Sequence, residues 1–119
     1  MKILALAAAA AAIAVPSALA ARHARQAGGS LVATDGPGFT ITLTQGGKKV
    51  ASLAAGTYTI KVQDKSNIHD FHLTGPGVNK TTKVPFVGTQ TWKVTLKKGA
   101  YKYVCDPHAS IMKGAFRVK

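Results

Sequence analysis

Acidic residues are scarce in this sequence. It has four, all of them aspartate, against 16 lysines and arginines, which gives its 119 residues a formal net charge of +12. That balance favours acidic partners or anionic surfaces. The charged fraction of 17% and the apolar fraction of 46% do not fit a disordered tail or an arginine-packed nucleic-acid-binding arm. We therefore expect one compact basic domain and no nucleic-acid partner.

A hydrophobic run long enough to cross a bilayer, which takes about 20 residues, is also missing. The apolar stretch from Ile3 to Val15 follows Lys2 and precedes Ala18-Leu19-Ala20, a small-x-small pattern that signal peptidase recognises. We predict a signal peptide over residues 1–20, export to the periplasm or the extracellular space, and no transmembrane anchor after cleavage.

Cysteine is nearly absent, because Cys105 is the sole thiol, and an internal disulfide is therefore excluded. Small exported domains usually contain paired thiols. A single thiol in an oxidising compartment is a liability unless it is buried, pairs between chains or binds a metal. A buried structural thiol is the simplest interpretation of an isolated cysteine, and the residues around Cys105 favour a metal instead.

Helical periodicity is missing as well, since no stretch of ten residues after Ser30 repeats apolar residues every 3.6 positions. Apolar and polar residues instead alternate, as they do in strands, over residues 39–43, 58–62 and 92–96. This alternation places Phe39 on an apolar, inward face. Turns rich in glycine and proline separate such segments at regular spacing, which predicts two antiparallel sheets packed face to face.

The domain organisation follows from these patterns. Residues 21–29 lack periodicity and end in a glycine pair, which predicts a flexible leader. Residues 30–119 are expected to form one all-β domain, a monomeric sandwich of seven to eight strands.

Three residues that bind soft metals lie close together near the C-terminus, namely Cys105, His108 and Met112. Alternation puts Cys105 on the same strand face as Tyr101 and Tyr103, so the thiol is expected to point inward. A thiolate, an imidazole and a weak thioether form most of a copper site, but a trigonal centre with two histidines and one cysteine needs another imidazole.

His69 and His72 are the candidates for that second imidazole. In a strand, alternate residues share a face. His69 therefore lies on the same face as the apolar Phe71 and Leu73, and His72 lies on the solvent-exposed face. We therefore predict that His69 completes the site.

Together these motifs resemble the cupredoxins, small blue copper proteins of the plastocyanin and amicyanin kind, over roughly residues 30–119. The resemblance implies a Greek-key β-sandwich that binds copper. It implies His69, Cys105 and His108 as equatorial ligands and Met112 as a weak axial ligand. It also implies a one-electron carrier that cycles Cu(I) and Cu(II) and is not an enzyme. The lysine-rich surface predicts redox partners with acidic docking surfaces.

Two features depart from the family pattern. Asp70 follows the first histidine where asparagine is usual, and a second acid, Asp106, follows Cys105. Negative charge near the metal favours Cu(II), so these acids predict a lowered reduction potential. The alternative is that Asp70 lies in solvent and Asp106 forms an Asx turn before Pro107.

Two other functions fit the sequence. One is a copper-holding or copper-delivery protein of the cell envelope, and the other is a metal-free basic β-sandwich that binds polyanions. Cleavage after Ala20 would also create the N-terminus Ala21-Arg22-His23, whose amine, amides and imidazole can enclose Cu(II) or Ni(II) in a square plane.

Overall fold

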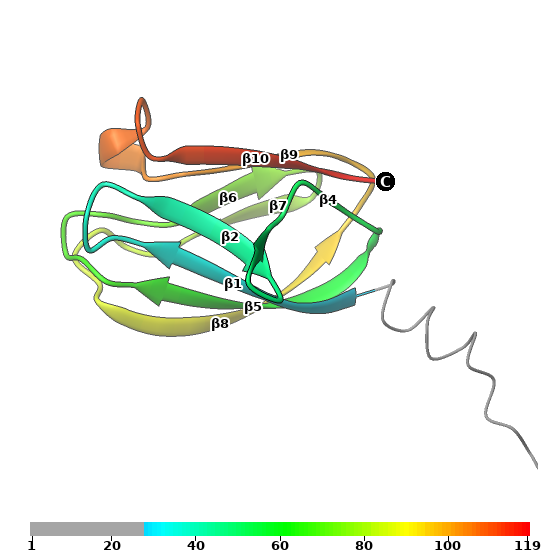
Figure 1. Ribbon diagram of the computed structural model, residues 1–119, viewed down its shortest axis with the longest axis horizontal. Helices are drawn as coiled ribbons and strands as arrows, with labels where there is room; N and C mark the ends of the chain where they lie inside the picture. Colours follow the sequence, from blue (N-terminus) through cyan, green and yellow to red (C-terminus); the bar gives the residue numbers. More distant parts are fainter. Residues whose placement is uncertain (1–27) are drawn as a thin grey trace, which may run out of the picture.

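A computed structural model describes residues 28–119, which fold into two packed five-stranded sheets (Figure 1). The first sheet has the strand order β3-β2-β1-β5-β8 and the second β4-β10-β9-β6-β7. The strands are β1 (Gly28–Asp35), β2 (Ile41–Gln45), β3 (Lys48–Lys49), β4 (Ser52–Leu53), β5 (Gly56–Asp64), β6 (His72–Gly75), β7 (Val78–Thr81), β8 (Gly88–Leu96), β9 (Gly99–Val104) and β10 (Lys113–Val118). The one helical element in this part of the chain is the 3-10 turn η1 (Asp106–His108), so no helix there is long and apolar enough to cross a membrane.

The predictions for the N-terminal region lie outside the described residues. This applies to the signal peptide at 1–20, to residues 21–27 of the leader and to Ala21-Arg22-His23. Strand β1 begins at Gly28, two residues before the domain boundary expected from the glycine pair.

The core forms where the predicted alternation turns apolar side chains inward. Tyr58, Ile60 and Val62 of β5 are buried, and so are Trp92 and Val94 of the neighbouring strand β8. The polar residues between them, such as Thr59, Lys61 and Lys93, are exposed on the outer face. The inner face of the second sheet adds stacked aromatic pairs, Tyr101 on Phe116 and Phe71 on Tyr103.

Three details of the fold differ from the prediction. The strand count is ten rather than seven to eight, because β3 and β4 have only two residues each, too few to show alternation. The sheets are mixed, since β1 pairs with β5 and β4 with β10 in parallel. A strand shows the same alternation of apolar and polar residues whether it pairs in parallel or antiparallel. The sequence therefore did not reveal the parallel pairs. Phe39 is 57% exposed because it precedes β2, in a loop.

Four loops meet at one end of the sandwich, the left end in Figure 1, opposite the C-terminus. They span residues 36–40, 65–71, 82–87 and 105–112. We call this region the loop end. It contains the four residues predicted to bind copper, which are His69, Cys105, His108 and Met112.

Candidate metal centre

Three of the predicted metal-binding residues converge at the loop end. The Cys105 Sγ lies 3.7 Å from Nδ1 of His69 and 3.5 Å from Nδ1 of His108. The two Nδ1 atoms are 3.1 Å apart. One thiol and two imidazole nitrogens thus face a common point.

This triangle has the size that a metal ion requires. The point equidistant from the three atoms lies about 2 Å from each, close to the usual length of a metal–imidazole bond and slightly short of a metal–thiolate bond. The cluster combines soft sulfur with two imidazoles, the donor set of blue-copper centres. The residues present therefore fit a copper ion.

Two of the donors come from one tight loop. Cys105 directly follows β9, and Pro107 lies in the 3-10 turn η1 that brings His108 back toward the sulfur. The Cys105 N–H donates to the Met112 carbonyl at 3.0 Å, and the Met112 N–H donates to the His108 carbonyl at 2.9 Å. Met112 is fully buried inside the loop that these bonds close.

The third donor, His69, comes from the loop before β6 rather than from the predicted strand. It is fully buried, as the alternation predicted, and His72 is partly exposed at the start of β6. Gly36 adopts a φ of +68°, and a Cβ there would approach the His69 ring to 3.1 Å. The glycine therefore lets the backbone of the 36–40 loop lie against the histidine.

Comparison with known proteins agrees with this geometry. The sequence matches the plastocyanin/azurin family of copper-binding proteins over residues 14–119. The chain belongs to this family. No curated protein matches it.

Solved structures of rusticyanin share the cupredoxin fold of this chain. Reduced rusticyanin is 22% identical, with a TM-score of 0.56, over 78% of this chain and 80% of its own. A Met-to-Gln mutant of rusticyanin is 22% identical, with a TM-score of 0.58, over 78% of both chains. Rusticyanin from Thiobacillus ferrooxidans is 23% identical, with a TM-score of 0.53, over 78% of both chains.

In this cupredoxin the acid after the first histidine ties the two ligand loops together. Asp70 is 3% exposed, so the alternative that it lies in solvent is wrong. Its Oδ1 accepts the N–H of Asp106 at 2.6 Å, and Thr81 Oγ1 donates to its Oδ2 at 3.2 Å. Burial raises the pKa of Asp70, and the nearby carboxyl of Asp106 acts in the same direction.

The second acid, Asp106, points toward the surface, where its carboxylate contacts a histidine instead of forming the Asx turn before Pro107. The Asp106 carboxylate contacts Nδ1 of His72 at 2.9 Å, and Nε2 of His72 lies 2.6 Å from Oδ1 of Asn79. The pKa of Asp106 is lowered by its contacts with Asp70 and then His72. Burial lowers the pKa of His72, but the contacts with Asp106 and Asn79 outweigh burial and leave it raised.

Burial makes the Cys105 thiol harder to ionise. Burial raises the pKa of Cys105, while the backbone amides of Asp70 and His108 lower it by less. A thiol must lose its proton to bind a metal, so copper uptake in this cupredoxin is expected to release a proton.

Sequence reasoning missed Phe39 as part of the centre. Its ring contacts both histidine rings edge-on, with centroid distances of 5.3 Å to His69 and 5.0 Å to His108. The alternation over 39–43 assigned it to the core, and only its position beside the Asp35-Gly36-Pro37-Gly38 turn could have suggested a loop residue.

Replacing Asp70 with asparagine is expected to raise the reduction potential, by on the order of tens of millivolts, because a negative charge beside the metal is removed. Asparagine has the same shape and can still accept the Asp106 N–H. Voltammetry of the copper-loaded variant and the wild type measures the difference. An unchanged visible spectrum is the control for an intact ligand set. Equal potentials would show that Asp70 carries no charge that the metal senses.

Proposed function

We propose that this cupredoxin is an exported one-electron carrier in which His69, Cys105 and His108 hold copper and Met112 is the weak axial ligand. The observation that carries the proposal is the convergence of one sulfur and two imidazole nitrogens within 3.7 Å of one another. Bound copper supplies a Cu(II)/Cu(I) couple that exchanges single electrons. The four residues match the set implied by the family resemblance.

The surrounding protein favours fast electron exchange by keeping the donors in place. Cys105, His69 and Met112 are fully buried, and packing and the closed 105–112 loop hold their positions. Donors that hardly move between two oxidation states leave little structural change to accompany the electron. Burial also excludes water that would compete for the metal.

His108 is the donor nearest the surface and would serve as the exit for the electron. It is half-buried, in contrast to the other three proposed ligands. Four large apolar side chains at the loop end are strongly exposed and could contact a partner there. They are Phe39, Ile68, Val87 and Ile111.

The proposal includes the cellular setting and the partners. The signal-like N-terminus supports export to the periplasm or the extracellular space, and the net charge of +12 supports docking to proteins with acidic surfaces. Cupredoxins are generally carriers rather than enzymes, and we propose a non-enzymatic, monomeric protein here as well.

Titration of the copper-free protein with Cu(II) tests the proposal. The wild type is expected to bind one equivalent and to develop intense visible absorption from charge transfer between the thiolate and copper. Cys105→Ser should lose this absorption. His69→Gln should lose or strongly weaken it, while His72→Gln, the matched control outside the cluster, should keep it.

The other outcomes identify the competing functions. Tight binding without intense colour, or release of copper to a chelator on reduction, would support copper storage or delivery and contradict a carrier. A reversible one-electron voltammetric response with copper retained would support the carrier. Failure to bind stoichiometric copper would contradict both and leave a metal-free polyanion-binding sandwich, which the family membership disfavours.

A further inference from the structure

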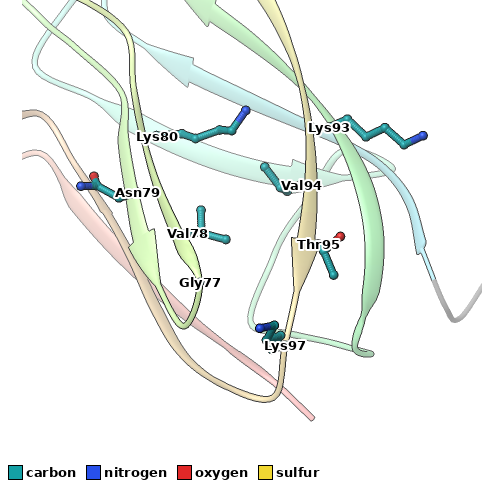
Figure 2. A pocket seen from close by; sticks show the side chains of 8 residues that line it. All are labelled: Gly77, Val78, Asn79, Lys80, Lys93, Val94, Thr95 and Lys97. Carbon is teal, nitrogen blue, oxygen red and sulfur yellow. The ribbon is translucent and has the colours of Figure 1, made fainter.

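A basic groove runs between the edges of the two sheets, away from the proposed metal centre. Its walls are β7 and β8, and it has a volume of about 290 Å³ (Figure 2). Val78 and Val94 face each other between the two strands in this view, so the floor is apolar.

Two lysines reach across this groove from opposite walls. Lys80 extends from β7 toward β8 in Figure 2. Lys97, just after β8, leans over the β6–β7 turn, where its Nζ is 3.7 Å from the position a Cβ would take on Gly77. A third lysine, Lys93, lies on the outer rim.

Among the described residues, no acidic side chain lines the groove. The four aspartates of the chain are Asp35, Asp64, Asp70 and Asp106, which lie in or next to the loops of the loop end. The lysine charges of the groove are therefore not neutralised by any lining residue. Figure 2 shows the Lys80 and Lys97 ammonium groups at opposite ends of the groove, so an extended segment lying along it would bring different anionic groups to each lysine.

The backbone of the groove is also available for pairing. Within residues 28–119, β7 pairs only with β6, and β8 pairs only with β5. The free edge of each strand offers N–H and C=O groups, and an extended peptide can add to such an edge as a further strand.

We propose that this groove docks an extended, acidic segment of a partner protein, with separate carboxylates at Lys80 and at Lys97 and an apolar side chain against the partly buried Val78. A peptide fits better than a polysaccharide or a lipid surface because the groove combines free strand edges and an apolar floor with its charge. The inference rests on the proposed function in one respect, because the class of partner, a protein with an acidic surface, is taken from it. Binding itself needs no copper.

Binding of a synthetic peptide of alternating glutamate and valine tests the proposal. The double variant Lys80→Gln/Lys97→Gln is expected to bind about tenfold more weakly than the wild type at low ionic strength. The matched control is Lys48→Gln/Lys49→Gln, which removes the same charge from exposed positions on β3, at the other edge of the first sheet. This control should retain near wild-type affinity. NMR shifts on titration should be largest at the amides of β7 and β8.

Other results would overturn the proposal. An equal loss of peptide affinity in both double variants would mean that net charge alone attracts the peptide. Binding of heparin or of phosphatidylglycerol vesicles that depends on Lys80 and Lys97, without peptide binding, would identify another class of ligand. Cys105→Ser should bind the peptide as the wild type does, so a failed copper titration and a failed docking experiment remain separate results.

Discussion

Replacing Asp35 with asparagine is expected to raise the free energy of unfolding by several kcal/mol at pH 8 and to leave it nearly unchanged at pH 4. Asp35 ends β1 and is fully buried beside Asp64, its cross-strand partner at the end of β5, which is 2% exposed. Within residues 28–119, neither carboxylate oxygen of Asp35 has a hydrogen-bond partner. Two neighbouring buried carboxyls cannot both ionise without a large cost.

The pH window follows from the raised pKa of Asp35. Burial first, then the Asp64 carboxyl and the charge of Asp70, raise this pKa from 3.8 to about 8. Between about pH 4 and pH 8 the folded protein keeps a proton that the unfolded chain releases, so the contribution of Asp35 to stability falls as the pH rises through this window. A tenfold difference in proton affinity between the folded and unfolded chains corresponds to about 1.4 kcal/mol of stability.

Asparagine removes this titration and keeps the shape of the side chain. Its amide can donate to Oδ2 of Asp64, which has no other partner in the described part of the chain. Denaturant unfolding of both proteins from pH 4 to pH 8 measures the effect, and the difference between them cancels the titration of groups that do not interact with Asp35. If the difference in the free energy of unfolding between the two proteins does not change with pH, the folded protein does not hold a proton at Asp35.

Gly75→Ala is expected to destabilise the fold by about 3 kcal/mol, because the new methyl group would overlap the ring of Tyr101. The ring cannot easily move aside. It stacks on Phe116 at 5.2 Å, and its hydroxyl accepts the Lys97 N–H at 2.9 Å and lies 3.0 Å from the Pro76 carbonyl.

Gly38→Ala is the matched control for this prediction. A Cβ at Gly38 meets no atom within 4 Å, and its backbone does not require glycine, so stability should change by less than about 1 kcal/mol. Denaturant unfolding of both variants measures the two effects. Equal stability of Gly75→Ala and the wild type would show that the Tyr101 ring shifts at little cost.

The sequence pointed to the three side chains that converge at the candidate site, but revealed little of their surroundings. Spacing placed Cys105 and His108 in one loop, and a period of two chose His69 over His72, although His69 lies in a loop rather than in a strand. Asp35 precedes Gly36-Pro37-Gly38, a sequence typical of a turn, yet it is a buried strand residue beside another acid. Nothing in a linear pattern shows that two acids 29 residues apart face each other.

The sequence alone determined the properties that depend on residue type and short-range periodicity. These are the positive charge, the impossibility of an internal disulfide, the alternating strands and the soft donors near the C-terminus. The tertiary structure alone decided which distant segments meet, because parallel pairing and loop packing bring together residues that no local pattern relates. The approach of His69 to Cys105, which are 36 residues apart, is one such contact. The burial of Asp70 and the groove between β7 and β8 are others.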